Sequence, residues 1–179
     1  DLSKLENIEK VLDKGFKKSL ETSKLYDINC QDIENKKLDL KKFKDHHILL
    51  VNIASQCGYT GQLADLQKLY KKYKAKKFTV LAVPSNQFYQ EPLNGVSIGD
   101  FCKRNYGVNF PILKKSDVNG AGRHEIYTYL IDSMPAGSRH KIKWNFEKFL
   151  IAPGGEVLGR YSSSTSIEAI EKFLINYLK

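Results

Sequence analysis

The sequence has only three cysteines, Cys30, Cys57 and Cys102, and no two of them form a CxxC pair. An odd number of widely spaced cysteines excludes a secreted disulfide scaffold, and the lack of paired ligands argues against a zinc site. We therefore expect the cytoplasm or another reducing compartment. Asp1 is not an initiator methionine, so we expect any targeting segment to lie upstream of this sequence.

Long hydrophobic runs are also absent. The longest, at residues 48–51 and 78–83, are far shorter than the roughly 18 residues of a membrane span. Acidic residues are outnumbered by basic ones, 20 against 29, which gives a net charge of +9. This excess favours anionic partners such as phospholipid, nucleic acid or an acidic protein. Because the lysines are scattered and no nucleic-acid-binding motif accompanies them, we interpret them as a solvated surface and expect no nucleic-acid partner.

Apolar patterns along the 179 residues predict one layered α/β domain at residues 25–179, preceded by an amphipathic helical extension at residues 1–24. Continuous apolar runs at 48–54 and 78–83 are typical of strands buried on both faces, and the helical stripe between them predicts a parallel βαβ unit. We expect a hairpin at 26–30 and 37–40, a short strand at 110–113, and a hairpin at 146–151 and 157–161. Further helices are predicted at 97–106, 125–133 and 167–178.

Cys57 has the position of a reactive group, because it follows the predicted strand at 48–54 and precedes the predicted helix that contains Leu63. Ligands and reactive groups collect at the carboxyl ends of strands in α/β sheets, and a helix N-terminus favours thiolate over thiol. A buried structural cysteine remains the alternative. Thr60 stands where a CxxC motif would have its second cysteine, so Cys57 cannot close a local disulfide. Once oxidised, Cys57 would either stay as a single oxidised cysteine or form a disulfide with a distant cysteine.

Three segments resemble the motifs of the glutathione peroxidase family. Residues 51–60 (VNIASQCGYT) are similar to its peroxidatic motif, residues 84–88 (PSNQF) followed by 90–92 (QEP) to its second motif, and residues 143–150 (KWNFEKFL) to its third. The resemblance covers residues 25–179 and implies a thioredoxin-like fold with a central mixed sheet flanked by helices. It implies a peroxidase that reduces hydrogen peroxide and organic or lipid hydroperoxides.

The resemblance also implies roles for individual residues. Cys57 would be the peroxidatic nucleophile, in the position that selenocysteine holds in selenoprotein members, and Gln87, Trp144 and Asn145 would complete the family's tetrad. Side-chain N–H donors around sulfur favour its anionic form and orient the peroxide. Without the resemblance, Trp144 would be interpreted as a core residue and the two amides as caps of turns.

Cys102 matches the resolving cysteine of the two-cysteine, thioredoxin-dependent members, which implies a Cys57–Cys102 disulfide. Since Cys102 falls on a predicted helix, we expect that helix to unwind locally during turnover; a half-buried structural residue is the alternative. Cys30 has no matching role. The resemblance implies no selenocysteine, haem or metal cofactor, and an external thiol as reductant.

The sequence leaves open whether the partner that supplies the reducing thiol is a thioredoxin-like dithiol protein or glutathione. The segment 134–143 is short where tetrameric members carry a longer loop, so we expect a monomer of the phospholipid-hydroperoxide type that contacts an anionic membrane surface.

Two alternative functions use the same residues. The protein could be a redox sensor or relay that passes oxidation from Cys57 to a partner protein, or a basic binding module with a vestigial thiol. Hydrolase chemistry has little support, because the four histidines lie in no known catalytic motif.

Overall fold

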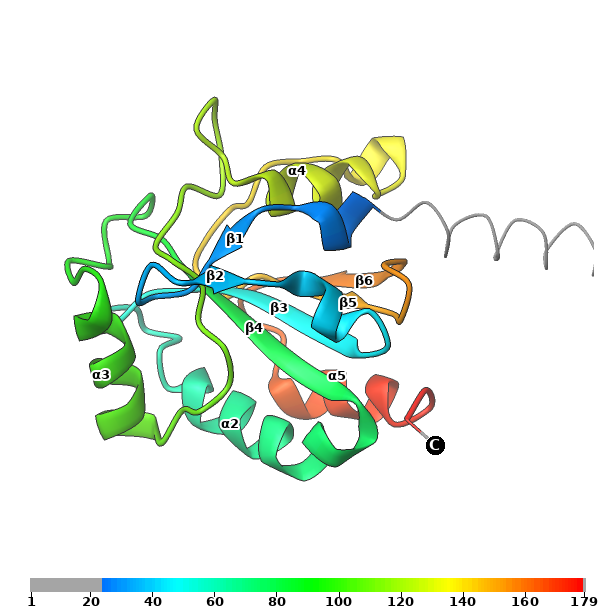
Figure 1. The fold of residues 1–179 in the computed structure, drawn as a ribbon, viewed down its shortest axis with the longest axis horizontal. Coiled ribbons are helices and arrows are strands. Elements are labelled where there is room, and N and C mark those ends of the chain that lie inside the picture. The colour runs from blue at the N-terminus through cyan, green and yellow to red at the C-terminus, as the bar shows by residue number, and fades with distance from the viewer. Residues whose placement is uncertain (1–23, 179) are drawn as a thin grey trace, which may run out of the picture.

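The computed structural model describes residues 24–178, and a four-stranded mixed sheet lies at its centre (Figure 1). The strands stand in the order β4 (Phe78–Pro84), β3 (His47–Ile53), β5 (Lys148–Ile151) and β6 (Val157–Tyr161). β3 and β4 are parallel, whereas β5 is antiparallel to both β3 and β6. The predicted parallel pair and the predicted C-terminal hairpin are thus confirmed. The predicted N-terminal helical extension lies outside the described residues, apart from Lys24.

Helices and short turns of 3-10 helix surround this sheet. The α-helices are α2 (Gln62–Tyr73), α3 (Val96–Tyr106), α4 (Glu125–Asp132) and α5 (Ile167–Leu174). A separate hairpin pairs β1 (Cys30–Gln31) with β2 (Lys37–Leu38), and the 3-10 turns are η1 (Lys24–Asp27), η2 (Leu40–Phe43), η3 (Lys74–Lys76) and η4 (Ala136–Ser138). All the helices expected within residues 24–178 are present. None of the helices among these residues is both long and apolar enough to cross a membrane.

The sheet separates two hydrophobic cores, because successive side chains of a strand point to opposite faces. Leu49, Val51 and Ile53 of β3 pack on the side of α2, α3 and α5. Ile48 and Leu50 pack on the opposite side with α4 and the β1–β2 hairpin. Figure 1 shows this arrangement, with α2 and α5 on one side of the sheet and α4 on the other. A strand covered on both faces explains why β3 is apolar at nearly every position.

Several details differ from the sequence-based expectations. The strand expected at 146–151 begins only at Lys148, and the last helix, expected at 167–178, ends at Leu174. Residues 110–113 form no strand: Ile112 and Leu113 make only isolated bridges, to Ala82 and to Asp32. Pro111 lacks an N–H donor, which limits a continuous ladder at this point. The first expected hairpin strand is also shorter, since Tyr26 belongs to η1 and pairing starts only at Cys30.

Buried charges at the start of β5 connect the sheet to the loops around it. Glu147 and Arg160 form an ion pair of 2.9 Å, and their side chains are only 5% and 6% exposed. The next residue, Lys148, is completely buried, and its ammonium donates to the carbonyl oxygens of Ser163 at 3.0 Å and Thr165 at 2.9 Å. Burial lowers the pKa of Lys148 to about 8. This lysine therefore fixes the loop that leads into α5.

Candidate active site

Cys57 lies in the turn that joins β3 to α2, at the carboxyl end of β3, as expected from the sequence. Its side chain is half-buried and packs against the core on the α2 side of the sheet. The backbone N–H of Tyr59 donates to the sulfur at 3.4 Å. A backbone dipole directed at sulfur stabilises negative charge there. The donor comes from this turn and not from the first residues of α2, which begins at Gln62.

Thr60 fixes the conformation of this turn. Its hydroxyl oxygen accepts from the backbone N–H of Cys57 at 3.0 Å, and its O–H donates to the carbonyl of Ala54 at 2.8 Å. The backbone N–H of Thr60 also donates to the carbonyl of Cys57 at 3.0 Å. The residue that stands in place of the second cysteine of a CxxC motif is therefore a structural support for the turn that carries Cys57.

A second segment, Gln90 and Glu91, holds the residues just before Cys57. The backbone N–H of Gln56 donates to the Gln90 carbonyl at 3.0 Å. The Glu91 carboxylate accepts from both the backbone N–H and the hydroxyl of Ser55, at 2.9 and 2.6 Å. The first and second motifs are thus joined by hydrogen bonds between chain segments more than thirty residues apart.

Asn145 and Trp144 reach the same region from the loop before β5. Asn145 is completely buried and donates through Nδ2 to the side-chain oxygen of Gln90 at 2.9 Å. The Trp144 ring is 39% exposed and packs against Phe88, with 5.4 Å between ring centroids. The Trp144 carbonyl accepts from the Asn52 side chain at 3.0 Å, which attaches this loop to β3. The third motif is therefore tied to the second motif and to the strand that precedes Cys57.

Gln87 is bound to a different loop. Its side-chain oxygen accepts from the backbone N–H groups of Val118 and Asn119, both at 2.7 Å, and its Nε2 donates to the Asn119 carbonyl at 3.0 Å. Within residues 24–178, the hydrogen bond from Tyr59 is the one observed to the Cys57 sulfur, and neither Gln87 nor Asn145 donates to it. The second and third motifs converge on this end of the sheet, while their amides are engaged with other partners.

The other two cysteines are buried thiols. Cys102 is 1% exposed and lies on the inner side of α3, and Cys30 is 2% exposed in β1. Burial, with a smaller contribution from the negative charge of Glu91, raises the pKa of Cys102 to about 12. Burial also raises the pKa of Cys30 to about 11. None of the three forms a disulfide in this structure, and Cys57 is the one that is not fully buried.

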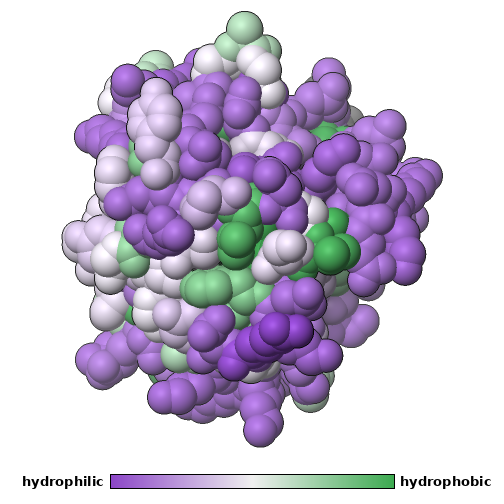
Figure 2. Space-filling view, turned by 90° about the vertical axis from the view of Figure 1, so that its left-hand side faces the viewer, coloured by the Kyte–Doolittle hydropathy of each residue, from purple (hydrophilic) through white to green (hydrophobic). Residues whose placement is uncertain are grey.

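The helix that carries Cys102 is held mainly by its inner face. Ile98 and Cys102 are its two buried residues. Glycines with positive φ flank it at both ends, Gly95 with φ of 52° and Gly107, which is in the left-handed helical conformation, with φ of 66°. Figure 2 views the molecule from the side where α3 lies and shows a small hydrophobic area within a largely hydrophilic surface. Val96, at the start of α3, is 56% exposed.

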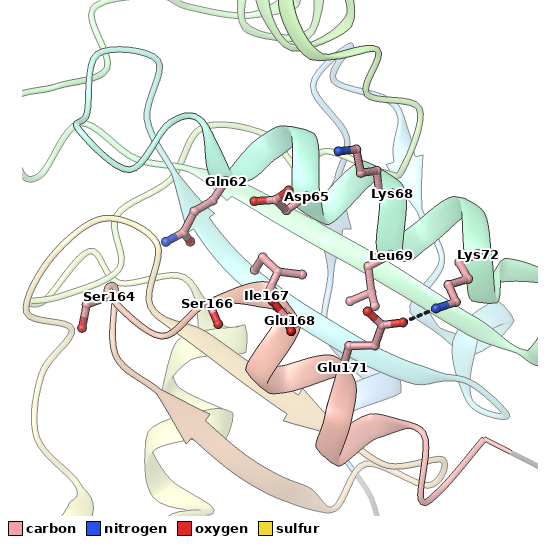
Figure 3. Close-up of a pocket in the computed structure, with 10 residues that line it drawn as sticks. All are labelled: Gln62, Asp65, Lys68, Leu69, Lys72, Ser164, Ser166, Ile167, Glu168 and Glu171. Carbon is pink, nitrogen blue, oxygen red and sulfur yellow. Dashed lines mark hydrogen bonds and ion pairs between the residues drawn. The ribbon is translucent and has the colours of Figure 1, made fainter.

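A polar groove of about 560 Å³ lies between α2 and α5, beginning beside Gln62 (Figure 3). Gln62 donates to the carbonyl of Ser163 at 2.9 Å, and at the other end Lys72 pairs with Glu171 at 2.6 Å. Its lining contains no cysteine or histidine. We therefore interpret the groove as a solvated seam between two helices and not as the reaction site. Among residues 24–178, no cluster of three or more His, Cys, Asp or Glu side chains could hold a metal ion.

The fold and the accessible cysteine at a strand's carboxyl end define a thiol protein with a thioredoxin-like fold. A crystal structure of a thiol:disulfide interchange protein of the thioredoxin family from Chlorobium tepidum TLS superposes with a TM-score of 0.63, covering 84% of this chain and 92% of that one. The two sequences are only 14% identical, so this likeness concerns the fold alone.

The chain belongs to the glutathione peroxidase family, whose sequence model matches residues 25–131. Glutathione peroxidase-like peroxiredoxin 2 of Saccharomyces cerevisiae is 44% identical over 154 residues, covering 84% of this chain and 94% of the relative. The crystal structure of T. cruzi GPX1 has a TM-score of 0.70 at 37% identity, covering 86% and 95% of the two chains. The protein is a peroxidase of this family, and the resemblance stated from its three motifs is confirmed.

Sequence reasoning missed several residues that build this site. Ser55, Gln90 and Glu91 were noted only as letters of the motifs, and Lys115 was not singled out. Lys115 donates from Nζ to the carbonyls of Glu91 and Leu93, both at 2.9 Å. Glu91 is completely buried, which acidic residues rarely are without a specific role. Both this burial and the partners of Glu91 are visible only in three dimensions.

Proposed function

We propose that Cys57 is the peroxidatic nucleophile and Cys102 the resolving cysteine of a hydroperoxide-reducing cycle that a thioredoxin-like dithiol protein completes. One observation carries the assignment of Cys57: it is the accessible cysteine of the three and the one whose sulfur accepts a backbone hydrogen bond. Cys30 and Cys102 are buried, with pKa values raised to about 11 and about 12, which opposes direct reaction with peroxide at neutral pH.

In the first step of the proposed cycle, the Cys57 thiolate attacks the terminal oxygen of the hydroperoxide. The O–O bond breaks, the alkoxide or hydroxide leaves and takes up a proton, and Cys57 becomes a sulfenic acid. The Cys102 thiolate then attacks this sulfur, so that an S–S bond forms and hydroxide leaves as water after protonation. A dithiol reductant opens the Cys57–Cys102 disulfide by thiol–disulfide exchange.

We assign Gln87, Trp144 and Asn145 to the surroundings of the reacting oxygen. The convergence of their loops on the end of β3 supports this assignment, as does the attachment of Asn145 to Gln90, which in turn binds the residue before Cys57. The amides of Gln87 and Asn145 have other partners in the reduced protein. Catalytic hydrogen bonds often tighten only in the complex with substrate, so we expect these donors to engage when peroxide binds.

A glutathione-dependent, one-cysteine cycle is the second candidate, because Cys102 is buried on the inner face of α3, which disfavours its attack on an oxidised Cys57. NADPH-coupled turnover with thioredoxin and its reductase, compared with glutathione and its reductase, separates the two. We expect thioredoxin to support turnover of the wild type and of Cys30→Ser, the matched control, but not of Cys102→Ser. If Cys102→Ser turned over with glutathione as fast as the wild type does, the one-cysteine cycle would be correct and the two-cysteine cycle wrong. Loss of activity in Cys57→Ser is required by both.

We also propose that the protein acts as a monomer that approaches anionic membranes. The net charge of +9 supports attraction to such a surface. Aromatic residues on the Cys57 turn and on the loops linked to it are exposed, with Tyr59 at 37%, Tyr89 at 91% and Trp144 at 39%. Tyrosine and tryptophan favour membrane interfaces. Gel filtration should give a monomer of 20.5 kDa. Co-sedimentation should occur with vesicles containing phosphatidylserine and not with vesicles of phosphatidylcholine alone; equal sedimentation with both would contradict this part of the proposal.

A further inference from the structure

Glu91 carries a carboxylate that is completely buried, with 0% of the residue exposed. Its oxygens accept three hydrogen bonds: from the Ser55 backbone at 2.9 Å, the Ser55 hydroxyl at 2.6 Å and the Leu93 backbone at 3.3 Å. In the described part of the chain, no cation pairs with this carboxylate. A buried carboxylate is costly to retain unless its oxygens are satisfied by well-placed donors. Here two of the three donors belong to a single residue of the Cys57 turn.

The backbone of Glu91 is itself held on both sides. Its N–H donates to the side-chain oxygen of Asn86 at 3.0 Å, and its carbonyl accepts from the Lys115 ammonium at 2.9 Å. Lys115 also binds the carbonyl of Leu93 and the side chain of Asn94, at 2.9 and 3.0 Å. The carboxylate is therefore presented from a segment that is fixed against the rest of the domain.

The two hydrogen bonds to Ser55 act on a residue only two positions before Cys57. Together with the bond from Gln56 to Gln90, they set the path by which the chain leaves β3 and enters the turn of Cys57. The charge of Glu91 also contributes to the raised pKa of Cys102, after the larger effect of burial.

We infer that Glu91 is a positioning residue for the reaction with peroxide, acting through Ser55 to hold the Cys57 turn in its reactive geometry. This inference rests on the proposed role of Cys57. A reacting sulfur that is misplaced by a fraction of an ångström loses the alignment with its N–H donors that the reaction requires. Glu91 itself exchanges no proton or electron in this role.

The test uses the full chain with Cys102→Ser, so that only the first oxidation step is observed. Trp144 is the only tryptophan of the sequence, and its fluorescence reports oxidation of Cys57 in a stopped-flow experiment with hydrogen peroxide. In Glu91→Gln an amide N–H₂ group replaces one of the two carboxylate oxygens that accept hydrogen bonds from Ser55. We expect the second-order rate constant for oxidation of Cys57 by hydrogen peroxide to fall roughly tenfold. Ser55→Ala should lower it about threefold, and the double variant should be no slower than Glu91→Gln alone, since both changes remove one interaction.

Alkylation of Cys57 by iodoacetamide distinguishes positioning from general loosening of the fold. Alkylation needs an exposed thiolate but not the peroxide geometry, so we expect it to change less than about twofold in both variants. Leu38→Ala, a change in the distant β1–β2 hairpin, is the control for lost stability and should leave the peroxide rate unaltered. A parallel change in alkylation and oxidation, or strictly additive effects of Glu91→Gln and Ser55→Ala, would overturn the inference.

A wild-type peroxide rate in Ser55→Ala would also overturn it, and this variant decides the matter if Glu91→Gln does not fold. Failure of the proposed function gives a different result. If Cys57→Ser still consumed peroxide at the normal rate, the nucleophile would be misassigned, whatever the behaviour of Glu91→Gln.

Discussion

Replacement of Lys148 by methionine should change the pH dependence of stability in a defined direction. Lys148 is completely buried, and its pKa is lowered to about 8 from an ordinary value of 10.5 because burial disfavours the charged form. Between these two pH values the unfolded chain holds a proton that the folded protein has lost. The free energy of unfolding contributed by Lys148 therefore rises as the pH increases through this range.

The size of the effect follows from the shift. A difference of one pKa unit corresponds to about 1.4 kcal/mol, so the full rise between pH 8 and pH 10.5 is about 3 kcal/mol, of which about 2 kcal/mol falls between pH 7.5 and 9.5. At pH 7.5 the methionine variant also leaves the carbonyls of Ser163 and Thr165 without this donor, at a cost of about 1–3 kcal/mol. The stability gap between wild type and Lys148→Met should hence widen with pH.

Guanidinium unfolding followed by circular dichroism at several pH values measures this gap. Subtracting the variant's free energy of unfolding from that of the wild type at each pH cancels the contributions of the thiols and tyrosines, which titrate in both proteins. Ile151→Val removes one buried methylene from the same strand and no charge, so its difference from wild type should not depend on pH. A constant gap for Lys148→Met between pH 7.5 and 9.5 would refute the reasoning.

Arg160→Met should cost about 3–5 kcal/mol in guanidinium unfolding, because it leaves the Glu147 carboxylate buried without its cation. Thr60→Val keeps the shape of the side chain but removes the two hydroxyl hydrogen bonds that fix the Cys57 turn. We expect stopped-flow oxidation by peroxide to slow roughly tenfold, and an unchanged rate would contradict the role given to that hydroxyl. Tyr89→Gly should raise stability by about 1 kcal/mol in the same unfolding assay, since Tyr89 has φ of 60° and its side chain is 91% exposed. A loss of stability would mean that the tyrosine ring makes favourable contacts.

Most of the fold follows from local sequence patterns. The apolar run of β3 predicts a doubly covered strand because both faces of the sheet are buried, and the stripe of α5 predicts a helix because only one of its faces meets the core. Residues 110–113 have the composition of a strand, but the chain there makes only isolated bridges beside Pro111. Composition describes a preference for extended backbone, whereas a ladder also requires a partner with free donors and acceptors.

The site was predictable as a set of motifs but not as a set of contacts. The position of Cys57 followed from the strand before it and the helix after it. The partners of Gln87 and Glu91 could not be read from the sequence, since their hydrogen bonds join segments 31 to 36 residues apart. Such bonds leave no periodicity in the chain. Thr60 could have been recognised as a cap, because a hydroxyl residue three positions after a turn residue can satisfy that residue's backbone N–H.

The glycine-flanked helix α3 sets an upper limit on the speed of the proposed second step. Opening it exposes the side chains of Ile98 and Cys102, which are 0% and 1% exposed, at a cost of about 4 kcal/mol. The open form would then be populated about once in a thousand molecules, and the observed rate of disulfide formation would be the intrinsic rate reduced by that fraction. Evolution could thus tune how long the sulfenic acid survives by changing the packing of a single helix, without altering either cysteine.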